Sequence, residues 1–362
     1  MKILIVQDHL RSGGTERQSV LLANAFADVG HLVTLLTFRP GGPLVPTLSE
    51  KVTHHSLQPF DTRLDWFAPG LTRMIERQPP NIILLMGRMA NCHGQGIVKE
   101  IRDRWPDTAV IGTMRTGKAL PWLFRLSLRN VRHIVANSHA AKATLEENHQ
   151  IPGDRITVIH NSLVFPDRTH ERNSALRQQH GANDNTAVLL DVAMFRPEKN
   201  QRELIDIAAG LPDDFPWQLW LAGDGPALTS CQAHARRLGV QDRVKFLGFL
   251  RNPEPLYATA DVAVHASRSE SLSNFLIEAQ AHGLPAVAYR AQGVEEAFIP
   301  GETGQGIDFG DHEGFRAALR RFADASPEIR QRARDFARRE FAPARQVKAY
   351  LDLFAKLLNV PS

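Results

Sequence analysis

Short apolar runs alternate along the chain with segments whose apolar residues recur at helical spacing. In the first half, apolar runs occupy residues 2–6, 31–38, 81–86, 109–113 and 133–136, with another inside 155–162. Helical spacing marks residues 19–29, 96–104 and 140–148 between them. Apolar strands alternating with helices are typical of parallel sheets that are covered on both faces. The pattern therefore predicts an open, doubly wound α/β domain.

The same alternation begins again in the second half. Strands are expected at residues 187–192, 218–222, 244–246, 262–265 and 286–289, and helices at 201–209, 227–238 and after Asn274. The polar stretch 166–186 separates the two series and indicates an interdomain connection with a short helix, so we expect domains at residues 1–167 and 168–342. The basic, helical stretch from about residue 326 ends in an amphipathic helix at about 343–362, which is expected to pack back on the first domain.

Composition narrows the class of protein. The 362 residues are enough for two domains with cores of their own. Residues 1–167 hold 19 Lys/Arg and 14 Asp/Glu, or +5, and the remainder hold 24 and 25, or −1, which gives the total of +4. Dense Lys/Arg runs with interleaved aromatic residues are absent, which argues against nucleic acid. The basic first half suits an acidic substrate or an anionic lipid surface, and an ordinary solvated surface explains it as well.

Cellular location and metal content are constrained by what the sequence lacks. No apolar run approaches the ~18 residues of a membrane span, and residues 2–6 are too short for the core of a signal peptide. Cys92 and Cys231 lie far apart, which indicates free thiols in a reducing compartment. We therefore expect a cytoplasmic protein, with peripheral contact at the inner face of the membrane left open. There is no D-x-D and the histidines are scattered, so no metal site is expected.

The stretch ESLSNFLIEAQAHGLP, residues 270–285, places two glutamates around a predicted helix N-terminus. Ser271, Ser273 and Asn274 are good N-cap residues, and residues 275–281 suit the following helix. A helix N-terminus can bind an anion through its free backbone N–H groups. A phosphate could lie there while Glu270, and Glu278 about one turn inside the helix, accept hydrogen bonds from sugar hydroxyls. Taken alone, a capped surface helix with two solvated glutamates explains the stretch better.

Three further loops follow predicted strands. In SGGTER, residues 12–17, Gly13 and Gly14 let the backbone approach a ligand, and a tight turn is as good an explanation. In FRPEKNQ, residues 195–201, Arg196 and Lys199 could neutralise phosphates, although a solvated basic loop is the simpler interpretation. In LAGDGPA, residues 221–227, Gly223 permits a tight turn. The chain contains neither G-x-G-x-x-G nor G-x4-G-K-[ST], so dinucleotide and P-loop interpretations lose support.

Together these segments resemble the retaining GT-B glycosyltransferases of family 4, and the resemblance runs nearly from end to end. The matching motifs are Gly13, Gly14 and Glu16, PEKN at 197–200, GDGP at 223–226, FLGF at 246–249, the E-x7-E pair Glu270 and Glu278, GVEE at 293–296 and GETG at 301–304. The resemblance implies two Rossmann-like domains facing across a cleft. It also implies that the first domain binds an acceptor and the second a nucleotide-sugar.

The resemblance assigns roles to individual residues on the donor side. Glu278 would bind the ribose hydroxyls and Glu270 the donor sugar, while Lys199 would neutralise the diphosphate leaving group in place of a metal. The remaining donor-side residues are Ser271, Leu272, Ser273, Asn274, Gly223, Asp224, Phe249, Gly13 and Gly14, and Arg196 joins Glu270 and Lys199 as a catalytic candidate. The nucleotide-sugar would be a substrate, so no cofactor is implied.

The sequence departs from the family pattern at two places. Met194 stands where the family commonly has an arginine, and Arg196, two positions later, is the expected substitute. Arg115 stands where the first domain usually carries a histidine near the transferred sugar, so His93 or Arg88 could fill that role. With Glu16, these three residues form the predicted acceptor side.

The implied activity is transfer of a sugar from a UDP- or GDP-sugar to a glycan, lipid-linked or other hydroxyl acceptor, in the synthesis of cell-surface polysaccharide or lipopolysaccharide. A nucleotide-sugar epimerase, a phosphorylase and a non-catalytic sugar-nucleotide binding protein remain as alternatives. The segment 115–133 mixes basic with apolar residues, which suits contact with an anionic acceptor or an anionic membrane surface. A core helix with a solvated basic face explains it somewhat better.

Overall fold

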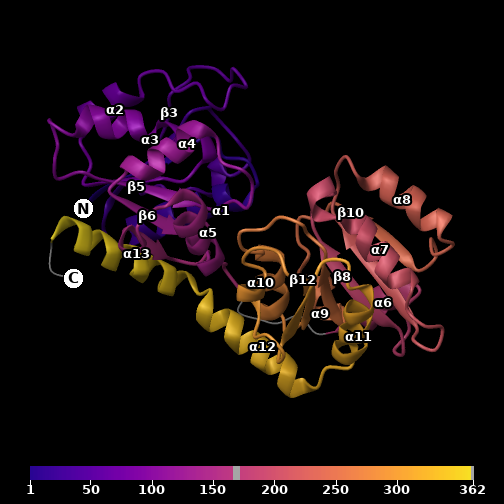
Figure 1. The fold of residues 1–362 in the computed structure, drawn as a ribbon. Coiled ribbons are helices and arrows are strands. Elements are labelled where there is room, and N and C mark those ends of the chain that lie inside the picture. Colours follow the sequence, from indigo (N-terminus) through magenta and orange to yellow (C-terminus); the bar gives the residue numbers. More distant parts are fainter. Residues whose placement is uncertain (166–171, 360–362) are drawn as a thin grey trace. The chain divides into compact units, whose positions relative to one another are not determined.

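The computed structural model describes residues 1–165 and 172–359 of the chain. Residue contacts divide it into two compact units, Met1–Ser162 with Pro343–Ser362, and Leu163–Ala342. Both units are α/β, with helices on either side of a central sheet (Figure 1). The boundary predicted between residues 167 and 168 lies outside the described residues.

The sheet of the first unit has seven parallel strands in the order β3-β2-β1-β4-β5-β6-β7. Its strands are β1 (Lys2–Gln7), β2 (Leu32–Thr37), β3 (Val52–Ser56), β4 (Ile82–Leu85), β5 (Ala109–Met114), β6 (His133–Ala136) and β7 (Ile156–Val158). Its helices are α1 (Gly14–Asp28), α2 (Leu71–Arg77), α3 (Arg88–Ile101), α4 (Trp122–Asn130), α5 (His139–His149) and α13 (Pro343–Leu358), with 3-10 turns at Val45–Thr47 and Gly153–Arg155.

Alternate residues of the central strands bury on opposite faces of this sheet. Leu4 and Val6 of β1 join a cluster that is covered by α2, α3, α4 and α5. Ile3 and Ile5 join a second cluster, covered by α1 and α13. Residues 3–6 of β1 are therefore all apolar, and the predicted doubly wound sheet is confirmed.

The sheet of the second unit has six parallel strands in the order β10-β9-β8-β11-β12-β13. Its strands are β8 (Ala187–Val192), β9 (Trp217–Ala222), β10 (Val244–Gly248), β11 (Val262–His265), β12 (Ala286–Tyr289) and β13 (Gly304–Ile307). Its helices are α6 (Ser174–Gln179), α7 (Gln201–Ala209), α8 (Leu228–Arg237), α9 (Glu254–Thr259), α10 (Asn274–Ala281), α11 (His312–Ala323) and α12 (Pro327–Glu340), with 3-10 turns at Pro197–Lys199 and Glu295–Ala297.

This second sheet is also packed on both faces. Leu190 lies in a cluster with residues of α9, α10 and α12, and its neighbour Leu189 lies in a cluster with residues of α7, α8 and α11. The strand order reverses between β8 and β11, because β9 extends the sheet on one side of β8 and β11 on the other. The first sheet reverses in the same way between β1 and β4. In open parallel sheets, loops that follow the strands at such a switch point form ligand sites.

Candidate functional site

Four charged side chains meet at the switch point of the second unit. Lys199 ends the turn after β8, and its ammonium group contacts the carboxylate of Glu270 in the loop after β11. His265, the last residue of β11, bonds the same Glu270 Oε1 through Nε2 at 2.9 Å. Its Nδ1 bonds Asp191 Oδ1 of β8 at 3.0 Å. The structure therefore brings the predicted Lys199 and Glu270 together and adds two residues that the sequence analysis missed.

The charges of this group stabilise one another. Burial alone would raise the pKa of Glu270, but the hydrogen bond from His265 and the nearby Lys199 outweigh it and hold that pKa at about 2. Burial alone would lower the pKa of His265, but its hydrogen bonds to Asp191 and Glu270 outweigh burial and raise it. Glu270 is therefore a carboxylate throughout the neutral range, beside an ammonium group that is a quarter exposed.

The N-terminus of α10 follows directly. Ser273 is its N-cap, with extended backbone, and its Oγ accepts a hydrogen bond from Leu276 N at 3.5 Å. Ser271 and Leu272 are buried beside it. The helix begins at Asn274, one residue before the predicted start at 275, and Ser273 is one of the predicted N-cap candidates. The predicted anion site at residues 271–274 therefore lies next to Glu270 in the chain, at the carboxyl edge of β11.

Glu278 is half-buried on α10 and is paired with a tyrosine. Tyr257 of α9, 2% exposed, donates its hydroxyl to Glu278 Oε2 at 2.6 Å. This bond fixes one carboxylate oxygen of Glu278. The sequence analysis did not identify Tyr257, because nothing in the α9 segment marks it as the partner of a residue 21 positions away.

Gly223 of the LAGDGPA loop allows the backbone of this loop to pack closely against a neighbouring loop. Gly223 has φ +142°, and a Cβ there would lie 2.1 Å from the carbonyl oxygen of Ala193. The loop after β9 thus packs closely on the loop after β8, and Phe195 N bonds Asp224 O at 2.9 Å. Phe249, after β10, is 69% exposed. The loops after β8, β9 and β10 are therefore neighbours at one edge of this sheet, whereas the predicted donor-side residues Gly13 and Gly14 belong to the first unit.

Arg196 does not join the Lys199–Glu270 pair. Its side chain is exposed, and its Nε contacts Met194 Sδ at 2.8 Å. Met194 is itself half-exposed. The expectation that Arg196 replaces a missing arginine stays a prediction.

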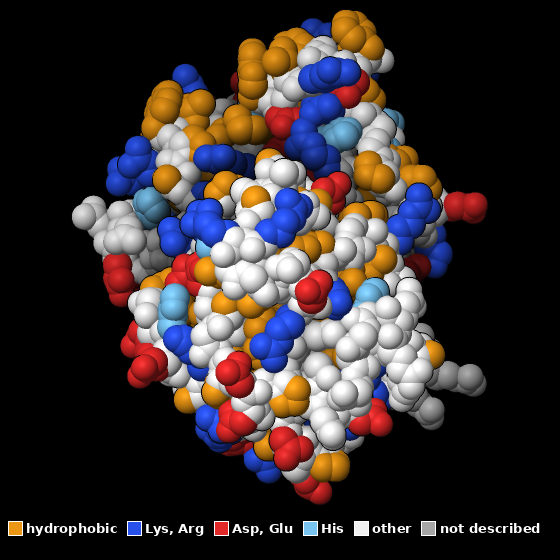
Figure 2. All heavy atoms as spheres, turned by 90° about the vertical axis from the view of Figure 1, so that its right-hand side faces the viewer, with side chains coloured by type: hydrophobic (Ala, Val, Ile, Leu, Met, Phe, Trp, Pro, Cys, Tyr) orange, Lys and Arg blue, Asp and Glu red, His pale blue; other side chains and the backbone are white. Residues whose placement is uncertain are grey.

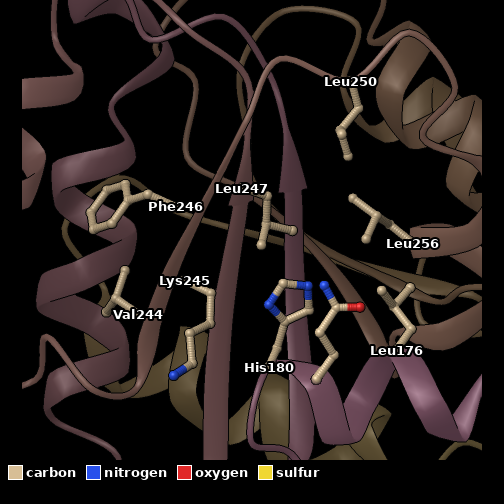
Figure 3. Close-up of a pocket in the computed structure, with 9 residues that line it drawn as sticks. Leu176, His180, Val244, Lys245, Phe246, Leu247, Leu250 and Leu256 are labelled. Carbon is tan, nitrogen blue, oxygen red and sulfur yellow. The ribbon is translucent and has the colours of Figure 1, made fainter.

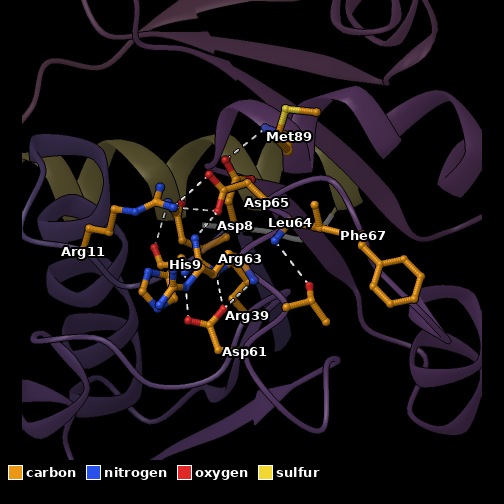
Figure 4. Close-up of polar contacts among 12 residues, drawn as sticks. Asp8, His9, Arg11, Arg39, Asp61, Arg63, Leu64, Asp65, Phe67 and Met89 are labelled. Carbon is orange, nitrogen blue, oxygen red and sulfur yellow. Dashed lines mark hydrogen bonds and ion pairs between the residues drawn. The ribbon is translucent and has the colours of Figure 1, made fainter.

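A second polar group lies at the carboxyl edge of the first sheet (Figure 4). Arg39, which follows β2, bonds both oxygens of Asp61 at 2.7 and 2.9 Å and also Asp65 at 2.7 Å. Arg11, which follows β1, bonds both oxygens of Asp65 at 2.6 and 2.8 Å. These bonds fasten the loop 57–70 to the ends of β1 and β2. The loop exposes Phe60, Leu64, Trp66 and Phe67.

Asp8, directly after β1, is buried in the same group. Its carboxylate accepts hydrogen bonds from Met89 N at 3.0 Å and Ala90 N at 2.7 Å, at the N-terminus of α3. Burial raises its pKa to about 6, although these two backbone hydrogen bonds oppose the shift. Asp8 therefore gains a proton in mildly acidic solution. Sequence analysis missed it, although a lone acid ending a buried strand was a usable signal.

Gly13 and Glu16 open α1 close to this group. Gly13 is the N-cap, and a Cβ there would lie 2.5 Å from Glu16 Oε2, so the glycine makes room for the glutamate side chain. Gly14 is the first residue of the helix. Burial raises the pKa of Glu16, and the charge of Asp65 contributes in the same direction.

The other predicted acceptor-side residues lie in different surroundings. His93 of α3 bonds Trp66 O through Nε2 at 3.0 Å, which ties α3 to the loop 57–70. Arg88 bonds Ala119 O at 3.1 Å. Arg115 turns toward α13 and donates to Tyr350 Oη at 2.6 Å. Arg115 thus has a structural partner within its own unit and does not contact His93 or Arg88.

A cavity in the second unit lies away from these residues. It has a volume of about 590 Å³, and Leu176, His180, Lys245, Leu247 and Leu256 are among the side chains that line it (Figure 3). Leu176 belongs to α6, Leu256 to α9, and Lys245 and Leu247 to β10. None of the predicted site residues lines it.

Helix α4 in the first unit exposes apolar and basic side chains together. Trp122 is 64% exposed, Leu123 and Leu126 are also exposed, and Arg125 and Arg129 lie on the same helix. Hydrophobic side chains likewise lie beside Lys and Arg at the upper end of Figure 2. Among the described residues, no helix combines the length and the hydropathy needed to cross a bilayer.

Comparison with known families shows which family the two halves of the chain match. Residues 12–163 match the family described as glycosyltransferase family 4, and residues 173–340 match glycosyl transferases group 1. The chain belongs to the family 4 glycosyltransferases of the GT-B type. The predicted family is confirmed, and so is the two-domain, Rossmann-like GT-B fold.

Curated relatives match over parts of their length. The chain is 34% identical over 171 residues to the lipopolysaccharide core biosynthesis glycosyltransferase LpsE of Rhizobium meliloti (strain 1021), covering 46% of this chain and 49% of LpsE. It is 25% identical over 258 residues to the N-acetyl-alpha-D-glucosaminyl L-malate synthase of Bacillus anthracis, covering 70% of this chain and 66% of the synthase. The chain thus spans about half to two thirds of the length of these relatives.

Solved structures share the fold over almost the whole chain. HepE of Anabaena, crystallised in complex with UDP, has a TM-score of 0.79 at 22% identity and covers 98% of this chain and 100% of HepE. Sucrose-phosphate synthase of Thermosynechococcus elongatus has a TM-score of 0.81 at 17% identity, over 99% of both chains.

Proposed function

We propose that the protein is a retaining glycosyltransferase that moves a sugar from a UDP- or GDP-linked donor to a hydroxyl of a glycan or lipid-linked acceptor. The observation that carries the proposal is the pairing of Lys199 with Glu270 beside the N-terminus of α10. Membership of the family supports sugar transfer. The name of LpsE, which refers to lipopolysaccharide core biosynthesis, supports a role in the synthesis of cell-surface polysaccharide or lipopolysaccharide.

The second unit is proposed to bind the donor. Glu278, with one oxygen held by Tyr257, accepts hydrogen bonds from the ribose hydroxyls. The backbone N–H groups of residues 271–274 bind phosphate or sugar oxygens. HepE was also solved with UDP-glucose, which supports a nucleotide-sugar as the donor class.

Charge development explains the roles of Glu270 and Lys199. As the glycosidic bond breaks, the sugar gains oxocarbenium character and the leaving diphosphate gains negative charge. The carboxylate of Glu270 is proposed to favour the first change, and the ammonium group of Lys199 the second. Because Lys199 supplies this positive charge, the reaction is proposed to need no divalent metal. We assign no covalent nucleophile.

The first unit is proposed to bind the acceptor. Carboxylates and exposed aromatic rings lie close together there, at Asp61, Asp65, Trp66 and Phe67, and this combination suits a sugar with hydroxyl groups and an apolar face. Helix α4 carries the opposite charge and suits contact with an anionic membrane, where a lipid-linked acceptor would lie.

A two-step experiment tests the proposal. UDP-, GDP- and ADP-sugars are first screened by thermal shift, because a ligand that binds the folded protein raises its melting temperature. The donor so identified is then incubated with glycan and lipid-linked acceptors, and the anomeric configuration of the product is read by NMR. Glu270→Gln is expected to lose transfer while it still binds nucleotide.

Other outcomes identify the alternatives. An epimerised nucleotide-sugar without transfer points to an epimerase, phosphate-dependent glycoside cleavage to a phosphorylase, and donor binding without turnover to a binding protein. Each of these results would overturn the proposal, and so would the absence of any sugar-nucleotide ligand.

A further inference from the structure

His265 lies between two carboxylates in the interior of the second unit. Its side chain is 1% exposed, and its two ring nitrogens bond Asp191 at 3.0 Å and Glu270 at 2.9 Å. An ionised carboxylate can only accept hydrogen bonds, so both ring nitrogens must carry a proton. The geometry therefore describes an imidazolium cation flanked by two anions.

The exposure of the four side chains, Asp191, His265, Glu270 and Lys199, increases from the core toward the ligand side. Asp191 and His265 are each 1% exposed, Glu270 is 11% exposed and Lys199 is 26% exposed. The charges alternate along this line, so the four groups are neutral together. Asp191 and His265 are enclosed, whereas Glu270 and Lys199, at the outer end, keep exposed surface toward a ligand.

Donor binding would change the partners of Glu270. A diphosphate next to Lys199 competes with Glu270 for the ammonium group, so the carboxylate loses part of the interaction that keeps it ionised. His265 stays in place, because Asp191 holds its other nitrogen and the Phe275 ring packs on it at 5.5 Å. His265 then supplies the remaining positive charge beside Glu270.

We propose that His265, held protonated by Asp191, is a positioning residue that keeps Glu270 ionised and aimed at the donor sugar while Lys199 contacts the diphosphate. The proposal rests on the function proposed above. It assigns no contact between His265 and the substrate, and His265 acts through Glu270 alone.

The kinetic test compares three variants over the pH range from 4.5 to 8. His265→Gln keeps a hydrogen-bond donor but removes the charge, and Asp191→Asn keeps the shape but removes the anion that holds the imidazolium. His234→Gln is the matched control, because His234 is also buried in this unit and bonds one carboxylate, Asp206, at 2.5 Å.

His265→Gln is expected to lower kcat at least tenfold. It is also expected to bring the acidic limb of kcat, which lies below the measured range while the pKa of Glu270 is about 2, up into that range, since the pKa of Glu270 rises. The donor KM is expected to change less than about threefold, because ribose and phosphate contacts remain. Asp191→Asn shifts the limb in the same direction, whereas His234→Gln leaves it unchanged. A His265→Gln profile that superimposes on that of the wild type overturns the proposal.

A spectroscopic measurement on the wild type is independent of activity and of how the variants fold. With labelled histidine, NMR is expected to show the ring of His265 still as imidazolium at pH 7, above the ordinary pKa of histidine, and to show an earlier loss of the proton in Asp191→Asn. A neutral His265 ring at pH 7 overturns the proposal. If the wild type transfers no sugar at all, the proposed function fails, and this measurement still decides the state of His265.

Discussion

Replacing Glu278 with alanine is expected to weaken nucleotide binding about 100-fold. Two ribose hydroxyls donate to one carboxylate in the proposed complex, and hydrogen bonds to a charged group are worth about 1.5–3 kcal/mol each. Glu278 is only half-buried, so the lower end of that range applies, which gives about 3 kcal/mol, or two factors of ten in Kd. Turnover at saturating donor is expected to fall less, because the ribose partner contributes to the ground state and the transition state alike.

Tyr257 allows the same site to be tested without removing the charge. Tyr257→Phe leaves Glu278 in place but removes the 2.6 Å bond that orients it, so a loss of about 1 kcal/mol, roughly fivefold in Kd, is expected. In a Glu278→Ala background this bond no longer exists, so adding Tyr257→Phe is expected to cost less than it does in the wild type. The non-additivity of the two changes measures their coupling.

Isothermal titration calorimetry with UDP and GDP is the assay, and circular dichroism verifies that each variant is folded. Glu313→Ala, which removes an exposed glutamate from α11 of the same unit, is the control and is expected to retain the wild-type Kd. Wild-type affinity in a folded Glu278→Ala variant would refute the ribose assignment.

Further predictions concern stability, pH, metals and membranes. Arg177→Met breaks a buried ion pair with Asp261 and is expected to lower the free energy of unfolding by about 3–5 kcal/mol in urea titrations. The pKa of Asp8 is raised to about 6 in the folded protein, so its contribution to stability is greatest below pH 4 and is lost as the pH rises through 6. Asp8→Asn should remove this pH dependence of the free energy of unfolding. An unchanged dependence in the variant would contradict the role of Asp8. Sugar transfer should persist in EDTA, and loss of activity that only a divalent cation restores would refute metal independence. Neutralising Lys118, Arg125 and Arg129 together should weaken co-sedimentation with anionic vesicles at low salt, and no wild-type binding even there would exclude the membrane contact.

The strands of the sheet interior were the easiest part of the fold to predict. Residues 187–192, 262–265 and 286–289 coincide with β8, β11 and β12, because a strand buried on both faces is mostly apolar. The two strands that the sequence analysis missed, β3 and β13, lie at sheet edges. β3 has the sequence VTHHS and β13 the sequence GQGI, and neither carries the apolar run that marks an interior strand.

The starts of helices were less predictable where the first turns consist of polar residues. Helix α1 begins at Gly14, five residues before the predicted start at 19, because the polar residues GTERQ form its first turns. Helix α10 begins at Asn274, within one residue of the predicted start at 275, since serine caps leave a local signature in the sequence.

The candidate site was predictable only as far as its residues share a motif. Glu270, Glu278 and Lys199 belong to short recognisable patterns. His265 and Asp191 do not, because they are 74 positions apart and meet only through the parallel pairing of β8 with β11. Both are nevertheless polar residues within apolar strands, in LLDV and VAVH, and such residues need a buried partner.

The helix α13 has a consequence for how the protein is made. Its Tyr350 and Phe354 are fully buried and pack against Phe26 of α1 at ring distances of 6.0 and 5.5 Å. A ribosome synthesises these residues only after the whole second unit, so the first unit leaves the exit tunnel with Phe26 and its neighbours uncovered. The second unit can complete its core during translation, while the first must wait for α13. The first unit therefore exposes apolar surface to chaperones for the longest time during synthesis.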